Sequence, residues 1–303
     1  MRNTYLKELY DFAKADDRVV SLVADNGVIV YDNFMNDFPD RFYNFGISES
    51  HMVSAAAGMA SCGLIPYVYT VSAFLVYRAY EFLRDDVCYQ NQNVKIVGIG
   101  SGLTYSTLGP SHHTTEDIAL LRSLPNLTVF SPCCRQEVPW IMHKSYELNG
   151  PVYIRLSNNN EDYYQGDQYF RLGVPAELQA GDDVATFVTG SIAVVAMKAA
   201  HRLEAEGISV AVYSVHTLKP LAETEIAAII SKYKKIIVLD EHNMIGGVYS
   251  ALTDIMISKQ VIRPVLNIGL EDKFAVGYGS ISDVRGMNGL AEDCVYQKIK
   301  EYV

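Results

Sequence analysis

The stretch from Phe45 to Tyr77, FGISESHMVSAAAGMASCGLIPYVYTVSAFLVY, decides the fold, because from Met52 onward it contains no Asp, Glu, Lys or Arg. Such an uncharged run is long enough to cross a membrane. However, it is rich in Ala and Ser, and Gly63 and Pro66 interrupt it. The break divides it into a helix of small residues and a β-rich piece, PYVYT. This division predicts the close-packed core of a globular protein rather than a membrane span.

Short β-branched runs alternate with longer amphipathic segments on both sides of this stretch. Expected strands lie at residues 19–24, 66–70, 94–100, 127–130, 152–156, 183–190, 208–215, 235–240 and 264–269. Expected helices lie near residues 3–14, 49–62, 75–91, 115–123, 134–148 and 191–206, and after Pro220 and Gly246. The alternation is typical of α/β proteins with mostly parallel sheets flanked by helices. A polar, turn-rich segment interrupts it, so we expect two domains, residues 1–157 and 181–303, joined by a linker at residues 158–180.

Charge and cysteine content exclude several kinds of partner. The 303 residues carry a formal net charge of −10, whereas nucleic-acid binders need a basic face. No basic run exceeds the pair Lys234 and Lys235, so an anionic membrane surface is not expected as a partner. Five cysteines without C-x-x-C spacing indicate reduced thiols, and the charged N-terminal sequence lacks an apolar export signal. We therefore expect a cytoplasmic protein that binds neither nucleic acid nor membranes.

The segment FGISESHM places an acid where the end of a strand meets a helix. Gly46 turns the chain, and Glu49 then begins the helix of small residues. The helix dipole favours an acid at this position. Taken alone, Glu49 is therefore typical of an ordinary helix start.

Two further patterns follow along the chain. In LGPSHHTTEDIALLRSLPN, residues 108–126, a Gly-Pro turn presents His112 and His113 immediately before a helix. The pair lacks the spacing of a zinc site, so no metal site is expected in this chain. Phe74 and Tyr77 stand three residues apart and would share one face of an α-helix. Taken singly, these patterns are more typical of a loop and of a core than of a catalytic site.

In their order and spacing these segments resemble the transketolases and, nearly as closely, the 1-deoxyxylulose-5-phosphate synthases. GISESHM is similar to the family segment G-[IV]-x-E-[HQ], and GPSHHTTEDIALLRSLPN is similar to GP-T-H-x-x-x-E-x-x-x-x-x-R-x-x-PN. VTGSIAVVAMKAA, LKPL and DEHNMIGGVYSAL are similar to the carboxy-terminal domain of the family. The resemblance extends from about Val19 to about Leu290 and covers only a pyrimidine-binding domain and a carboxy-terminal domain.

The resemblance implies a thiamine-diphosphate enzyme. Glu49 would hydrogen-bond N1′ of the cofactor's aminopyrimidine and so promote loss of the thiazolium C2 proton, a task that favours a dry, apolar pocket. Phe74 and Tyr77 would pack around the pyrimidine, and Asp25 would lie near the cofactor. His112 would hydrogen-bond the reacting oxygens of the substrate. The implied reaction cleaves a ketose beside its carbonyl and transfers the two-carbon ketol unit to an aldehyde.

One part of the family pattern is missing from this sequence. The family holds the cofactor diphosphate through Mg²⁺ with a G-D-G motif that an Asn follows. The nearest string here is Gly181-Asp182-Asp183, without an Asn at the required distance. We therefore expect a second chain to supply the diphosphate-binding domain and to hold Mg²⁺. The simplest assembly contains two copies of each chain around a homodimer of this one.

The sequence also departs from the family where the substrate phosphate would bind. Polar and cationic ligands of transketolases fall here on Gly100, Leu108, Asn158 and Ile29. Arg155, inside a predicted strand, is a candidate substitute ligand. We therefore expect the acceptor to be an unphosphorylated or nucleotide-linked sugar rather than an ordinary aldose phosphate.

Three alternatives remain open from the sequence. Two are related enzymes, namely a pyruvate-using synthase like 1-deoxyxylulose-5-phosphate synthase and the β subunit of a 2-oxoacid dehydrogenase. The third is a non-catalytic scaffold subunit that retains the fold, although an intact Glu49 argues against it. Comparing hydroxypyruvate, a ketose phosphate and pyruvate as donors would separate the enzymes.

Overall fold

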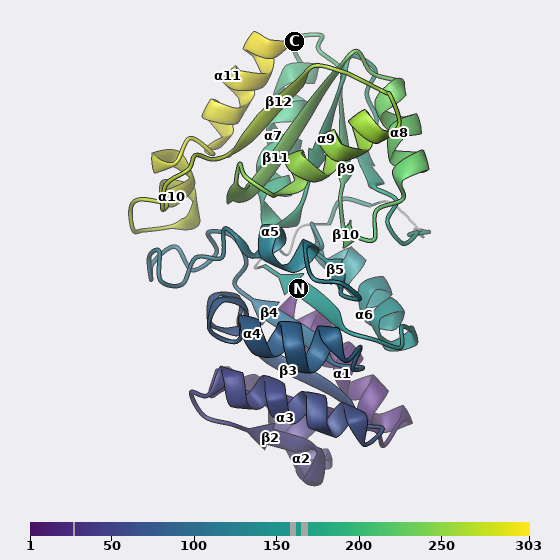
Figure 1. The fold of residues 1–303 in the computed structure, drawn as a ribbon. Helices are drawn as coiled ribbons and strands as arrows, with labels where there is room; N and C mark the ends of the chain where they lie inside the picture. Colours follow the sequence, from purple (N-terminus) through teal and green to yellow (C-terminus); the bar gives the residue numbers. More distant parts are fainter. Residues whose placement is uncertain (27, 158–161, 165–168) are drawn as a thin grey trace.

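Strands and helices alternate along the computed structural model, which describes residues 1–26, 28–157, 162–164 and 169–303 (Figure 1). The strands are β1 (Val19–Val23), β2 (Phe42–Asn44), β3 (Ile65–Val71), β4 (Lys95–Ile99), β5 (Thr128–Phe130), β6 (Val152–Leu156), β7 (Ala176–Gln179), β8 (Val184–Val188), β9 (Val210–Ser214), β10 (Thr217–Lys219), β11 (Lys235–Asn243) and β12 (Val265–Leu270). The α-helices are α1 (Arg2–Ala15), α2 (Asp32–Asp37), α3 (Glu49–Ser61), α4 (Tyr80–Phe82), α5 (Asp117–Arg122), α6 (Val138–Glu147), α7 (Ala193–Glu204), α8 (Glu223–Ser231), α9 (Val248–Ser258), α10 (Ile281–Met287) and α11 (Glu292–Tyr302). The 3-10 helices are η1 (Val28–Tyr31), η2 (Pro39–Arg41), η5 (Arg135–Glu137) and η6 (Gly190–Ile192), and the π-helices are η3 (Phe74–Arg78) and η4 (Leu83–Tyr89).

The strands form two mostly parallel sheets, one in each half of Figure 1. The first sheet has seven strands in the order β10-β5-β6-β4-β3-β1-β2, and the second has five in the order β12-β11-β8-β9-β7. Among these described strands, β10 with β5 and β7 with β9 pair antiparallel, and the other neighbours pair parallel. The predicted α/β class with two domains is confirmed.

Apolar side chains on both faces of the first sheet explain its position between two layers of helices. In β1, Val19 and Val23 pack with α1 and α6, whereas Val20 and Leu22 pack on the opposite face with α3. Successive side chains of a strand alternate between the two faces, so apolar residues at both odd and even positions indicate a strand that is buried on both sides.

The uncharged stretch divides where the sequence predicts. Its first part forms α3 and its second part forms β3, and the two are separated by Gly63. Ala56 and Ala57 of α3 are buried against the sheet, because their small side chains let the helix approach closely. Within the described residues, no helix combines the length and the apolar character that a membrane crossing requires.

The predicted helix at residues 75–91 has a different form in the structure. It is divided into the π-helix η3, the short α4 and the π-helix η4. A π-helix closes its hydrogen bonds at i+5, so each turn contains more residues than an α-helical turn. Consequently, a three-residue spacing such as that of Phe74 and Tyr77 no longer places two side chains on one face.

Three short strands, β2, β7 and β10, were missed, and the last two bear on the domain boundary. β7 lies inside the segment predicted as a linker, and its Ala176 pairs with Ser214 of β9, so the second sheet begins before residue 181. β10 lies in the second half of the chain, yet its Thr217 pairs with Phe130 of the first sheet. Both are edge strands of three or four residues. Such strands are too short for a clear alternating pattern.

Candidate functional site

A pocket opens at the carboxyl ends of β1, β2, β3 and β4, where parallel sheets of α/β proteins usually bind ligands. Its volume is about 310 Å³. It is lined by Ala24, Asp25, Asn26, Ile47, Glu49, Thr70, Val71, Phe74, Tyr105, Leu108 and His112, and is called the site pocket below. Five residues that the sequence singled out therefore come together here, namely Asp25, Glu49, Phe74, Leu108 and His112.

Glu49 is the first residue of α3, and its side chain is only 2% exposed. Gly46 has a φ of 64°, a left-handed conformation that lets the chain turn sharply from β2 toward this helix. One carboxylate oxygen of Glu49, Oε2, accepts a hydrogen bond from Nη1 of Arg78 at 2.7 Å. The sequence suggested purely apolar surroundings for Glu49. In the structure, however, one guanidinium contacts the buried carboxyl.

The rings of Phe74 and His112 meet at the wall of the site pocket. Their centroids are 5.0 Å apart with an interplanar angle of 67°, an edge-to-face contact. Nδ1 of His112 also lies 3.0 Å from the hydroxyl of Ser111. These contacts orient an imidazole at the wall of the pocket that Glu49 also lines.

Asp25 lies at the end of β1 with a φ of 52°, an unusual backbone conformation for a residue other than glycine. Asn44 at the end of β2 stabilises this turn. Its Oδ1 accepts hydrogen bonds from the backbone N–H of Asp25 at 3.1 Å and from that of Gly46 at 3.0 Å. The side-chain amide of Asn44 thus links the end of β1, which carries Asp25, to the end of β2, which leads to Glu49.

Tyr77 does not line the site pocket, in contrast to the expectation that it packs beside Phe74. Its hydroxyl donates a hydrogen bond to Oε2 of Glu116 at 2.5 Å and accepts one from the backbone N–H of Thr115 at 3.1 Å. Burial, followed by the carboxylates of Asp117 and Glu116, raises the pKa of Tyr77 well above its usual range, so the hydroxyl stays protonated. Tyr77 therefore holds the start of α5 instead of facing the pocket.

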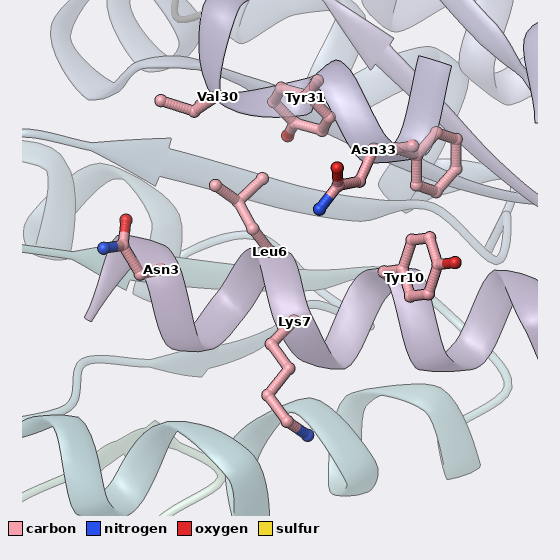
Figure 2. A pocket seen from close by; sticks show the side chains of 8 residues that line it. Asn3, Leu6, Lys7, Tyr10, Val30, Tyr31 and Asn33 are labelled. Carbon is pink, nitrogen blue, oxygen red and sulfur yellow. The ribbon is translucent and has the colours of Figure 1, made fainter. Parts of the chain in front are cut away.

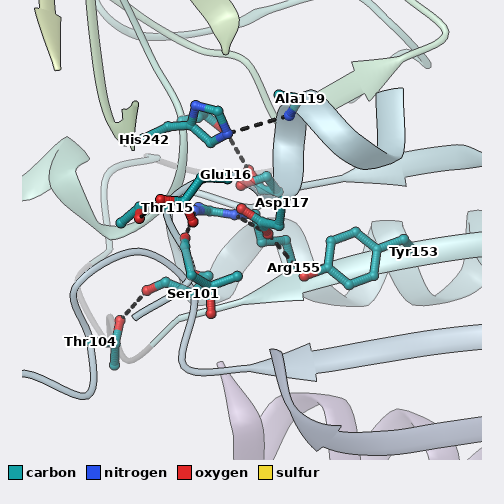
Figure 3. Close-up of polar contacts among 12 residues, drawn as sticks. Ser101, Thr104, Thr115, Glu116, Asp117, Ala119, Tyr153, Arg155 and His242 are labelled. Atoms are coloured by element: carbon teal, nitrogen blue, oxygen red, sulfur yellow. Dashed lines mark hydrogen bonds and ion pairs between the residues drawn. The ribbon is translucent and has the colours of Figure 1, made fainter. Parts of the chain in front are cut away.

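Arg155 of β6 does not reach the site pocket either. Its guanidinium Nε donates to Oδ2 of Asp117 at 2.8 Å, and Nη2 donates to the carbonyl of Thr114 at 3.0 Å. Tyr153 donates to the same oxygen of Asp117 at 3.0 Å, and Figure 3 shows Arg155 and Tyr153 converging on this carboxylate. The prediction of Arg155 as a phosphate ligand is therefore replaced by a role in a buried ion pair beneath α5.

The second domain holds the loop that carries His112. The backbone N–H of Asn243 donates to the carbonyl of Thr115 at 2.8 Å, and Ser106 donates to the carbonyl of Gly279 at 2.8 Å. His242 donates from Nδ1 to the carbonyl of Asn243, and its Nε2 accepts from the backbone N–H of Ala119 at 3.3 Å (Figure 3). The position of His112 thus depends on both domains.

His113, the second histidine of the pair, is buried beside the site pocket rather than in it. Within the described part of the chain, neither of its ring nitrogens has a hydrogen-bond partner. Burial lowers the pKa of His113, and the nearby charge of Glu241 opposes this effect only in part. A neutral imidazole is therefore favoured, which separates His113 from the more accessible His112.

Gly100 borders a second hollow of about 340 Å³, together with Arg2, Asn3, Thr104 and Tyr105. A side chain at Gly100 would collide with the ring of Tyr105, since a Cβ there would lie 1.9 Å from Cε2. The ring of Tyr105 thus occupies the space that a side chain at residue 100 would need. Burial raises the pKa of Tyr105, while the hydrogen bond with Asn26 and the charge of Arg2 oppose this rise. Arg2 therefore lies close to Tyr105, a position that no sequence signal indicated.

A third hollow follows along α1 and shares Asn3 with the second one. Its volume is about 330 Å³, and Figure 2 shows Leu6 and Tyr10 of α1 opposite Tyr31 and Asn33. The second hollow in turn shares Tyr105 with the site pocket. The three hollows therefore form one chain of neighbouring spaces. Of the remaining predicted ligands, Ile29 lies in η1, and Asn158 lies outside the described residues.

Two family models match this sequence. The model of the transketolase pyrimidine binding domain matches residues 1–162, and that of the transketolase C-terminal domain matches residues 175–282. A solved structure described as a split gene transketolase, an inactive beta4 tetramer, is 32% identical with a TM-score of 0.88. The match covers 99% of this chain and 96% of that one.

Three curated relatives are 32% identical to the chain. A protein of Methanocaldococcus jannaschii described as a transketolase C-terminal section matches over 99% of this chain and 95% of its own length. One subunit of an apulose-4-phosphate transketolase from Actinobacillus succinogenes matches over 86% of this chain and 85% of its own. A 1-deoxy-D-xylulose-5-phosphate synthase of Caldanaerobacter subterraneus matches over 97% of this chain but only 48% of its own.

Proposed function

The chain belongs to the transketolase family, and we propose that it is the C-terminal subunit of a two-subunit transketolase. In this role it transfers a two-carbon ketol unit from a ketose to an aldehyde. The observation that carries the proposal is the buried carboxyl of Glu49 at the wall of the site pocket, with Phe74 and His112 beside it. A scaffold subunit would not need an acid, an aromatic ring and a histidine around one space.

The site pocket fits the aminopyrimidine half of thiamine diphosphate. It offers a carboxyl oxygen of Glu49 for N1′, the ring of Phe74 for stacking, and apolar walls from Ile47 and Val71. When bound, the cofactor supplies the thiazolium carbon that takes up the two-carbon unit. In this arrangement Glu49 holds and returns a proton at N1′, and the apolar walls exclude water. His112 donates a hydrogen bond to the reacting oxygens of the sugar.

The diphosphate half of the cofactor is assigned to a partner subunit. Among the described residues, no group of three or more His, Cys, Asp or Glu side chains is placed to hold a metal ion. We therefore assign Mg²⁺ to a partner subunit with the G-D-G motif, in a cytoplasmic assembly of two copies of each chain around a homodimer of this one. The description of a 32% identical split gene transketolase as an inactive beta4 tetramer supports a need for this partner.

The acceptor is proposed to be an unphosphorylated or nucleotide-linked aldehyde rather than an ordinary aldose phosphate. Leu108 is half-exposed at the site pocket, Gly100 offers no side chain, and Arg155 is engaged with Asp117. Arg2 is then the one cationic side chain lining the second hollow among the described residues. The hollows that continue along α1 leave room for a group larger than a phosphate.

The donor and acceptor specificity of the reconstituted complex tests this assignment. With hydroxypyruvate or a ketose phosphate as donor we expect ketol transfer, whereas pyruvate should be a poor donor. Each charge-assisted hydrogen bond that the phosphate group cannot form weakens the binding free energy of the acceptor by roughly 1.5–3 kcal/mol. We therefore expect kcat/KM for ribose 5-phosphate not to exceed that for an unphosphorylated or nucleotide-linked aldehyde.

Two results would contradict parts of this assignment. Efficient use of pyruvate would favour the synthase alternative, whose relative matches this chain over 48% of its own length. A clear preference for ribose 5-phosphate would show that the phosphate site is rebuilt with other residues. Arg2→Met would then test whether Arg2 is the cation responsible. If it is, the variant should lose the preference for ribose 5-phosphate and keep its kcat/KM for neutral acceptors.

A further inference from the structure

Arg78 contacts both of the side chains that the proposed function places against the aminopyrimidine. Its Nη1 donates to Oε2 of Glu49 at 2.7 Å, and its guanidinium carbon lies 5.1 Å from the ring centroid of Phe74. The main chain reinforces the contact, because Ser50, next to Glu49, donates its hydroxyl to the carbonyl of Arg78 at 3.2 Å. One residue thus connects the start of α3 with the aromatic side of the site pocket.

The guanidinium approaches these groups from outside the site pocket. Glu49 and Phe74 line the pocket, whereas Arg78 does not. The side chain of Arg78 is 51% exposed, although its partner carboxyl is 2% exposed. Consequently Arg78 engages Oε2 of Glu49 without lining the pocket, and among the described residues no hydrogen bond engages the other carboxylate oxygen.

The energetics of a buried carboxylate give this contact a specific consequence. A carboxylate removed from water is costly unless hydrogen bonds or an opposite charge compensate it. Within the described residues, Arg78 is the one cation paired with Glu49. A guanidinium is planar and offers its donors in a fixed fork, so it restrains the carboxyl plane better than a flexible ammonium does. The contact therefore restrains the orientation of the carboxyl.

The backbone around Arg78 favours a fixed position for this guanidinium. Arg78 is the last residue of the π-helix η3, and Ala79 then leaves helical geometry with a φ of −101°. Single π-helical turns occur frequently at functional sites, where the extra residue redirects side chains. Here the wider turn separates Phe74 and Arg78, which face Glu49, from Tyr77, which contacts Glu116.

We propose that Arg78 is a positioning residue for cofactor activation. By holding Oε2 of Glu49 from outside, it directs the second carboxylate oxygen toward N1′ and keeps the ring of Phe74 beside it. The proposal rests on the proposed function, because it takes N1′ as the partner of Glu49 and the aminopyrimidine ring as the partner of Phe74. It extends that function to a residue that does not line the pocket.

The test compares Arg78→Ala and Arg78→Lys with the control Arg84→Ala. Arg84 is exposed and pairs with Asp85 in the adjacent η4, so its removal is a matched change outside the contact. In the complex reconstituted with a subunit carrying the G-D-G motif, Arg78→Ala should slow hydrogen–deuterium exchange at C2 by roughly 10–100-fold, the equivalent of one charge-assisted hydrogen bond. Arg78→Lys should restore part of the rate, ethylguanidinium added to Arg78→Ala should restore more, and Arg84→Ala should have no effect.

A second measurement needs no cofactor. The chain alone with Arg78→Ala should unfold at a temperature lower by about 2–4 °C, because the buried carboxyl of Glu49 loses its cation. Glu49→Gln in the same chain should remove most of this decrease, since a neutral amide does not need a counter-charge. If the effect of Arg78→Ala were merely structural, the unfolding temperature would fall by the same amount whether residue 49 is Glu or Gln.

The outcomes distinguish this inference from the proposed function. If Arg78→Ala behaves like Arg84→Ala in both measurements, or if neither Lys nor ethylguanidinium restores exchange, the positioning role of Arg78 is overturned. If Glu49→Gln slows exchange while Arg78→Ala does not, the inference fails and the proposed function stands. If Glu49→Gln also leaves exchange unchanged, the proposed function itself fails.

Discussion

Glu49→Gln should slow exchange of the cofactor's C2 hydrogen in the assembled complex by roughly 10²–10⁴-fold, the usual contribution of a positioned proton-transfer group. The amide has nearly the size of the carboxyl but cannot hold and return a proton at N1′. Each factor of ten corresponds to about 1.4 kcal/mol of activation free energy. The rate is measured by acid quenching after transfer to deuterated water, followed by determination of deuterium at C2.

The variant should retain its fold and its assembly, since the amide oxygen still accepts a hydrogen bond from Arg78. Glu8→Gln is the matched control, because Glu8 is also a buried acid but lies on α1 and outside the lining of the site pocket. We expect the control to exchange at the wild-type rate. If Glu49→Gln exchanged equally fast, Glu49 would be only an acid at the start of a helix.

Arg155→Met should lower the free energy of unfolding by about 3–5 kcal/mol, the usual effect of removing one partner of a buried ion pair. Arg155 is 2% exposed and Asp117 is 0% exposed, so the substitution leaves a carboxylate buried without its cation. Methionine preserves much of the length and apolar contact of the arginine side chain, which isolates the loss of charge. Urea unfolding of the chain alone, followed by circular dichroism, measures the change.

Two further variants separate the ion pair from general effects of the substitution. Arg171→Met removes an ion pair with Glu225 in which the arginine is 55% exposed, and exposed pairs contribute only about 0–1 kcal/mol. Arg155→Met combined with Asp117→Asn should recover most of the lost stability. If the double variant were as unstable as Arg155→Met, the loss would reflect packing rather than an uncompensated charge.

The central strands of both sheets could be predicted from the sequence because their side chains are buried on both faces. β1, β4 and β6 are mostly apolar, all their residues are buried, and they lie within a residue or two of the predicted bounds. The short edge strands β7 and β10 have only one paired side, so their residues do not need such a pattern. The π-helical turns η3 and η4 were also missed, since their residues are compatible with an ordinary α-helix.

The location of the site could be predicted better than its details. Asp25, Glu49, Phe74 and His112 follow different strands of one parallel sheet, so their carboxyl ends meet at one edge. Which cations lie nearby depends on contacts between distant segments, and the sequence therefore did not reveal Arg2 or Arg78. The burial of Arg155 had a visible signal, because its neighbours in VYIRL are apolar on both sides. A charged residue in such a strand needs a buried partner, which Asp117 provides.

The central claim is that this chain supplies one half of a cofactor site and that a separate subunit completes it. Titration calorimetry with thiamine diphosphate and Mg²⁺ tests the claim most directly, using this chain alone and then mixed with a candidate partner that carries the G-D-G motif. We predict weak binding to the chain alone and tight binding to the mixture, because the site proposed in this chain holds only the aminopyrimidine half. Tight binding to this chain alone would contradict the claim.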